Sequence, residues 1–269
     1  MMAGEFFKET VRRYWRQAVY WGVGIGLLGL YVMVIIRDVD MLKQYAELVA
    51  TMPPALLQAF GIADAAAMAT PEGFINFGFY SYSLLILAVF AVMVGMSVTA
   101  NEEDDGVLDV VLSLPVPRWR VVVEKFLAFA LIAAAITVIA FGGLLLGMQM
   151  SEIKVDVGRL VLSTLNLVPS LLLMIALTVF CGAIFHRRTT ALAAAAVVIV
   201  ASYFINFLGA SATGSAADAL RAVSFFAYYD SEAVMRSGLN AGNIALLLAA
   251  TAALVAGAVW AFQRRDIGV

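Results

Sequence analysis

Six apolar segments, each free of Asp, Glu, Lys and Arg, constrain this chain more than any other feature. About 20 apolar residues in a helix cross the roughly 30 Å hydrocarbon core of a bilayer. We therefore predict an all-α polytopic membrane protein, in which residues 1–269 form a single transmembrane domain. The six predicted transmembrane helices cover residues 18–36, 79–99, 127–149, 164–185, 190–209 and 244–262.

The composition agrees with a membrane protein and excludes several other classes. Of the 269 residues, 63% are hydrophobic and 13% are charged, whereas soluble domains are about half apolar and about a quarter charged. The isoelectric point of about 5.4 argues against a nucleic-acid partner, which needs a basic surface. Cys181 is the only cysteine and His186 the only histidine, so neither a disulfide framework nor a histidine metal site is possible. We expect no catalytic residue and no metal site.

The distribution of basic residues predicts which ends of the spans face the cytoplasm, because cytoplasmic loops carry an excess of Lys and Arg. One side holds eleven of them: Lys8, Arg12, Arg13, Arg16, Arg118, Arg120, Lys125, Arg187, Arg188, Arg264 and Arg265. The other side holds six: Arg37, Lys43, Lys154, Arg159, Arg221 and Arg236. We therefore expect a multi-pass protein of the inner or plasma membrane, with both termini, the loop over residues 100–126 and the turn around His186 in the cytoplasm.

Residues 1–17 are expected to form an amphipathic helix of their own. On a helical wheel at 100° per residue, one half is apolar and contains Phe6, Phe7, Thr10, Val11, Tyr14 and Trp15. The other half is charged and contains Glu5, Lys8, Glu9, Arg12, Arg13 and Arg16. A helix with such a basic face is suited to the headgroup layer, so we predict that it lies on the membrane surface.

Two segments on the expected outer side are longer than a connection requires. Residues 37–78 contain two short apolar runs separated by Pro53 and Pro54, and two short surface helices would fit them. Residues 210–243 become aromatic around Tyr228. Aromatic side chains prefer the membrane interface, so this second segment is expected to dip back into the outer leaflet.

The connection over residues 100–120 is the most polar segment between two spans. Asn101 is a good helix N-cap, and the carboxylates that follow it would occupy the first turn, where the helix dipole favours negative charge. An apolar stripe at i, i+3 and i+4 follows, and two prolines then end the helix. This pattern predicts a short amphipathic helix that is either a docking element for a soluble partner or an inert solvated loop. The residues concerned are Glu102, Glu103, Asp104, Asp105, Leu108, Val111, Leu112, Pro115 and Pro117.

This pattern resembles the signature of type-2 permeases of ATP-binding-cassette (ABC) exporters. The resemblance extends over the whole chain, through the six spans, the amphipathic start, the TPEGF sequence at residues 70–74, AYYD before the last span, and the terminal FQRRDI. Mild departures occur at Val107, Asp109 and Pro117, where the family commonly has Thr, Glu and Ser. The matching positions are Glu102, Gly106, Leu108, Asp109, Leu112, Pro115, Arg118 and Lys125.

The resemblance implies a coupling helix that sits in a cleft of a separate ATPase subunit and an N-terminal helix similar to the family's connecting helix. It also implies a second permease, forming a homodimer more readily than a heterodimer, and two copies of the ATPase. The ATP and Mg would be held by that partner, and this chain would hold no cofactor of its own. Contact with the ATPase would then fall to Glu102, Glu103, Asp104, Asp105, Gly106, Leu108 and Arg118.

Other features bear on the substrate and on rival classes. No G-x-x-x-x-G-K-[ST] phosphate loop occurs in the sequence, so the chain cannot cradle nucleotide phosphates as a P-loop does. Ion-coupled transporters usually keep ionisable residues within the membrane, and the absence of such residues here favours a hydrophobic or amphipathic substrate. The alternatives are an ATP-independent channel or secondary transporter, or a non-transporting anchor subunit. The polar residues that we assign to a substrate cavity are Asn166, Asn206, Thr178 and Tyr203.

Two pairs of glycines predict close helix packing. Gly22 and Gly26 are four residues apart, as are Gly143 and Gly147. Such pairs let two helices approach closely in a membrane. The sequence leaves open whether they pack within one chain or between two.

Overall fold

The computed structural model describes residues 4–35, 39–52, 68–98, 117–151, 154–185, 187–211, 219 and 221–264. Of these described residues, 91% are helical and none lies in a strand, which confirms the all-α prediction. The long helices are α1 (Glu5–Ile35), α5 (Ser81–Met96), α8 (Arg118–Met150), α9 (Val157–Ile184), α10 (Arg188–Ser211) and α13 (Ala241–Arg264). The shorter ones are α2 (Val39–Ala50), α4 (Pro71–Ile75), the π-helix η2 (Asn76–Tyr80), the 3₁₀-helix η3 (Phe225–Tyr228) and α12 (Ser231–Ser237).

Six helices in the described part of the chain are long and apolar enough to cross a membrane, as the sequence predicts. The second of them is a continuous rod over Pro71–Met96 that joins α4, η2 and α5. Several extend well beyond the predicted apolar segments. At 1.5 Å per residue, the 33 residues of α8 span about 50 Å, which exceeds the hydrocarbon core.

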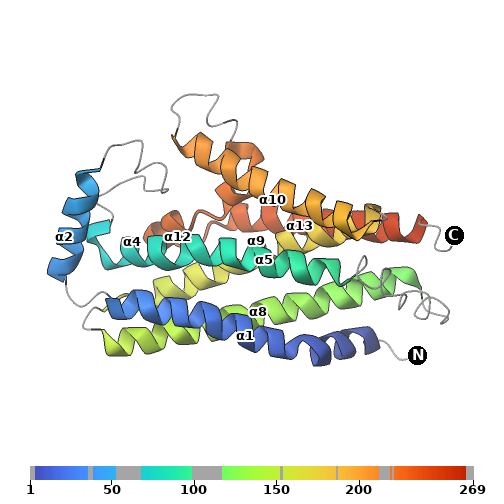
Figure 1. Cartoon of the computed structure of the whole chain (residues 1–269), viewed down its shortest axis with the longest axis horizontal. Helices are drawn as coiled ribbons and strands as arrows, with labels where there is room; N and C mark the ends of the chain where they lie inside the picture. Colours follow the sequence, from blue (N-terminus) through green and yellow to red (C-terminus); the bar gives the residue numbers. More distant parts are fainter. Residues whose placement is uncertain are drawn as a thin grey trace.

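The spans alternate in direction, so that both termini lie at one end of the bundle (Figure 1). We call this the termini end: α1, α8 and α10 begin there, and α5, α9 and α13 finish there. The opposite end carries α2, α4 and α12 (Figure 1). The connections over residues 99–116 and 185–187 therefore join helix ends at the termini end.

The tightest helix contact in the bundle lies between α1 and α8 and is built on the glycine pairs. A Cβ added to Gly143 would lie 2.1 Å from the backbone oxygen of Gly26, and one added to Gly147 would lie 2.6 Å from the Cβ of Met33. A Cβ on Gly22 would likewise lie 2.7 Å from Ile139 Cβ. Both glycine pairs thus pack α1 against α8 within one chain, which settles the choice that the sequence leaves open.

Helix α9 lies at the centre of the molecule. In its most apolar stretch 72% of residues are buried, against 22% for α10 and 17% for α13. Gly95 of α5 and Gly257 of α13 both face it, because a Cβ on either glycine would contact Thr178 or Phe180 within 3 Å. The least covered helices, α10 and α13, expose apolar side chains to the surroundings of this chain.

The prediction that the N-terminal helix over residues 1–17 is separate from the first span is wrong. Helix α1 continues without a break from Glu5 to Ile35. No proline or other helix-breaking residue separates the amphipathic part from the span. The charged face is exposed as predicted, but the apolar face turns toward α8. Thr10 is buried, and the rings of Tyr14 and Phe129 pack edge to face with centroids 5.0 Å apart.

The segments at the opposite end agree in part with the sequence interpretation. Helix α2 contains the first of the two apolar runs in residues 37–78. Its Tyr45 packs on Phe74 with ring centroids 5.7 Å apart. The second apolar run, at residues 56–60, lies outside the described residues. In the later segment, η3 and α12 pack on the bundle with Phe226 and Tyr229 buried. Contact of that segment with lipid stays a prediction.

Candidate functional site

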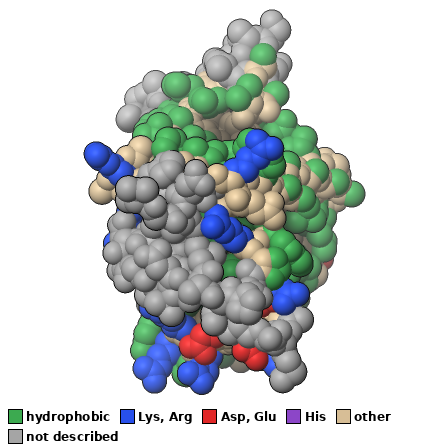
Figure 2. All heavy atoms as spheres, turned by 90° about the vertical axis from the view of Figure 1, so that its right-hand side faces the viewer, with side chains coloured by type: hydrophobic (Ala, Val, Ile, Leu, Met, Phe, Trp, Pro, Cys, Tyr) green, Lys and Arg blue, Asp and Glu red, His purple; other side chains and the backbone are tan. Residues whose placement is uncertain are grey.

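Basic side chains gather at the termini end of the bundle. Figure 2 views the molecule from this end and shows Lys and Arg side chains at several places on it. They come from α1, α8 and α13 and from the start of α10, so four different helices bring basic side chains to this end. The described members are Lys8, Arg12, Arg13, Arg16, Arg118, Arg120, Arg187, Arg188 and Arg264.

Three exposed tryptophans at the termini end each lie beside an arginine. The guanidinium of Arg264 lies 4.4 Å from the centroid of the Trp260 ring. Trp15 with Arg16 and Trp119 with Arg120 form similar pairs, each at 5.8 Å. Trp and Arg both favour the region where lipid headgroups meet water. These pairs are therefore suited to a membrane interface near this end of the bundle.

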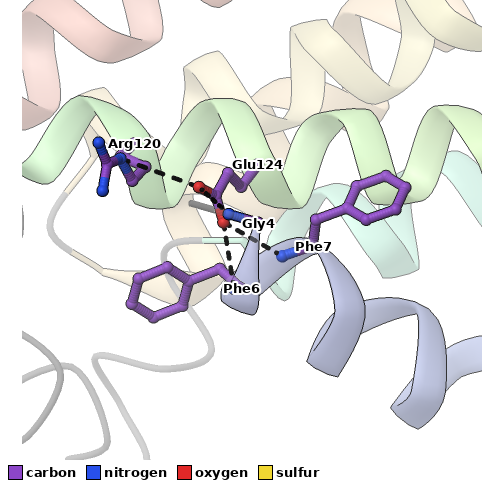
Figure 3. A network of polar contacts seen from close by, with 5 residues as sticks. All are labelled: Gly4, Phe6, Phe7, Arg120 and Glu124. Atoms are coloured by element: carbon purple, nitrogen blue, oxygen red, sulfur yellow. Dashed lines mark hydrogen bonds and ion pairs between the residues drawn. The ribbon is translucent and has the colours of Figure 1, made fainter. Parts of the chain in front are cut away.

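Glu124 of α8 links the starts of two helices at this end. Its carboxylate accepts backbone N–H groups of Gly4, Phe6 and Phe7, which belong to the first turn of α1 (Figure 3). Arg120, one turn earlier in α8, lies 3.9 Å from the same carboxylate. Sequence analysis missed Glu124. The available signal was that it is the only acidic residue of α8, directly before an apolar stretch.

A second polar network lies in the half of the bundle near the opposite end. The hydroxyl of Tyr80 lies 2.9 Å from both the backbone oxygen of Leu160 and the hydroxyl of Thr164. The hydroxyl of Tyr229 donates to the backbone oxygen of Tyr80 at 3.1 Å, and the amide of Asn166 donates to the backbone oxygen of Tyr229. π-Helices are frequent at functional sites, and Tyr80 ends one. The network joins η2, α9 and the segment before α12.

The family of the chain follows from comparison with known proteins. A family model described as ABC-2 family transporter protein matches residues 11–267. The chain belongs to the ABC-2 family. It is therefore a membrane permease of an ABC transporter. No curated protein matches the chain significantly.

The resemblance to ABC permeases assigns contact with the ATPase to seven residues, of which the structure describes one. Glu102, Glu103, Asp104, Asp105, Gly106 and Leu108 lie outside the described residues. Arg118 is the first residue of α8, directly after Pro117, and is half-buried. Lys125, which belongs to the same family pattern, is only 6% exposed. A buried lysine is unusual in proteins, and this burial was not predicted from the sequence.

The four residues assigned to a substrate cavity of this ABC-2 permease have different surroundings. Asn166 is 2% exposed, and Thr178 is fully buried and donates to Met174 of its own helix at 2.9 Å. Tyr203 and Asn206 lie one turn apart on α10 and are half-buried. The Tyr203 ring packs on Phe226 with centroids 5.5 Å apart, and Asn206 Oδ1 has no hydrogen-bond partner among the residues that the structure describes. Their role in transport stays a prediction.

A cavity of about 250 Å³ lies at the opposite end, between α4, α9 and α12. It is lined by charged and polar side chains, including Glu72, Asn76 and Arg159, and none of the four cavity candidates contributes to it.

Replacement of Asn166 tests whether this residue is structural. Asn166→Leu leaves the backbone oxygen of Tyr229 without its donor, so we expect a loss of about 1–3 kcal/mol of stability. Thr178→Val is the matched control, because it removes a hydrogen bond within one helix and should change stability by only about 0.6 kcal/mol. Thermal unfolding in detergent measures both. Equal losses in the two variants would contradict the assignment of Asn166 to the network.

Proposed function

We propose that this chain is the membrane-spanning subunit of an ATP-driven exporter. Two copies of it would form a homodimer, and two separate ATPase subunits would bind ATP and Mg. The cargo would be hydrophobic or amphipathic. The termini end would face the cytoplasm of a cell whose inner or plasma membrane holds the complex.

The family match over residues 11–267 carries this proposal, because permeases of this family normally work with an ABC ATPase subunit. The positions of the flanking helices support it further. Helix α5 ends and α8 begins at the termini end, where the basic side chains also gather. By the positive-inside rule that end is cytoplasmic, which is where a soluble ATPase would reach it.

The sequence supports an external source of energy. No phosphate loop occurs in it, so nucleotide would be bound by another polypeptide. The six apolar segments contain no Asp, Glu, Lys, Arg or His, which weighs against coupling to a proton or ion gradient. Both observations favour transport driven by ATP hydrolysis in a separate subunit.

The distribution of buried surface supports a second permease chain. Helices α10 and α13 are the least covered spans, and Tyr203 and Asn206 lie on α10. If these residues contact cargo, they can do so where two chains face each other. An interface that includes α10 would enclose them.

Purification of the tagged chain from its native membrane in mild detergent tests the proposal. We expect a second polypeptide that hydrolyses ATP to copurify in a 1:1 ratio, with the complex containing two of each chain. ATP hydrolysis should be absent when the permease is purified alone. Capture of no ATPase under conditions that keep the permease folded would favour a channel or an anchor.

A further inference from the structure

Helix α1 begins without a side chain of its own to cap it. The backbone oxygen of Gly4 accepts the first helical hydrogen bond, from Lys8 at 3.0 Å, so Gly4 is the N-cap residue. The N–H groups of the next residues have no partner within a helix. A Ser, Thr, Asp or Asn at the N-cap usually satisfies them, and glycine cannot.

The missing cap is supplied by Glu124, which lies 120 residues away in sequence. One carboxylate oxygen accepts the N–H of Gly4 at 3.0 Å, and the other accepts the N–H groups of Phe6 and Phe7 at 3.1 and 3.4 Å. These are the N-cap residue and the second and third helical positions, which an N-terminal capping box also serves. The Glu124 side chain is only 13% exposed. Figure 3 shows its carboxylate lying directly against the first turn of α1.

Farther along, the same two helices also pack through their glycines. In order from the termini end, Glu124 binds the first turn of α1, Tyr14 packs on Phe129, and Gly26 contacts Gly143. Both helices begin at the same end and run in the same direction. The pair is therefore joined at its start as well as along its length.

We propose that Glu124 is the positioning residue that makes α1 move together with α8 when the segment preceding α8 is displaced by the ATPase. This inference rests on the proposed function. Helix α8 follows that segment directly, whereas α1 has no covalent link to it. The carboxylate bridge at the base of α8 transmits displacement to α1 at the point where α8 is first moved. Without the bridge, α1 is held to α8 only by the packing inside the membrane.

Hydrogen exchange of the isolated permease tests the bridge itself. Glu124→Ala should speed amide exchange in residues 4–7 at least about tenfold, because charge-assisted hydrogen bonds are lost there, while exchange around Gly26 and Gly143 should stay unchanged. Glu5→Ala is the control, because Glu5 is an exposed acid of the same helix turn. Unchanged exchange in residues 4–7 of Glu124→Ala would overturn the proposal.

Distances between spin labels in the complex with its ATPase give the decisive measurement. Exposed Lys8 of α1, Leu127 of α8 and Leu248 of α13 are labelled in pairs as cysteines after replacement of Cys181. On trapping with ATP and vanadate, the 8–248 distance should change while the 8–127 distance stays constant. In Glu124→Ala, the 8–127 distance should change. A constant 8–127 distance in that variant overturns the role of Glu124, whereas a wild-type complex in which no distance responds to ATP overturns the proposed function.

Discussion

Replacing Gly143 with alanine is expected to lower the stability of the permease by about 3 kcal/mol, the upper part of the range for overpacked cores. The added Cβ would lie 2.1 Å from the Gly26 oxygen and 2.4 Å from the Gly26 Cα. Both atoms belong to the backbone of α1, so no side chain can rotate away. The two helices would have to separate along their whole contact. Thermal unfolding in detergent should show a midpoint lowered by several degrees.

The neighbouring glycine provides a matched control for this effect. A Cβ on Gly142 meets nothing within 4 Å, and alanine favours a helix more than glycine does. Gly142→Ala should therefore be neutral or slightly stabilising. If Gly143→Ala unfolded at the temperature of the wild type, or if Gly142→Ala were equally unstable, the close packing of α1 on α8 would be contradicted.

The second large effect is expected from charge reversal in the acidic segment. Glu102→Lys with Asp104→Lys should reduce capture of the ATPase at least about tenfold, because opposite charges would then face the partner where carboxylates are proposed to bind. The measurement is the amount of ATPase that copurifies with a tagged permease. A tenfold loss corresponds to about 1.4 kcal/mol of binding free energy.

A variant with the same change in net charge controls for nonspecific effects. Asp40→Lys with Glu47→Lys alters two exposed acids of α2 at the opposite end, and capture of the ATPase should be unchanged. Undiminished capture by the Glu102 and Asp104 variant would show that the acidic segment is not the contact. Equal loss in both variants would indicate a general effect of charge.

The spans and their close contacts were accessible from the sequence because they depend on local patterns. Six uncharged apolar segments predicted six membrane helices, and the spacing of Gly22 with Gly26 and of Gly143 with Gly147 predicted tight packing. That these glycines meet within one chain could not be predicted, because a small residue permits close approach without specifying the partner. The continuity of α1 from its amphipathic start into the span was also missed. Hydropathy indicates which residues lie in lipid, whereas a helix can continue beyond the lipid.

Polar partners were harder to predict than apolar ones. The amphipathic start of α1 has an apolar face, but the pattern cannot state whether lipid or α8 covers that face. Glu124 acts on amides that lie 117 to 120 residues away in sequence, and no spacing rule reaches so far. Asn166 was assigned to a cavity because it is polar in a span. Its partner is a backbone oxygen near α12, and backbone groups carry no signature in a sequence.

The central claim is that energy reaches this permease from a separate ATPase bound at the termini end. A photocrosslinking amino acid placed at Asp104, and in a second sample at exposed Lys43 of α2, tests it most directly in native membranes. The claim predicts that an ATP-binding polypeptide is crosslinked from position 104 and not from position 43. Crosslinking of that polypeptide from position 43, or of no ATP-binding polypeptide from position 104, would contradict it.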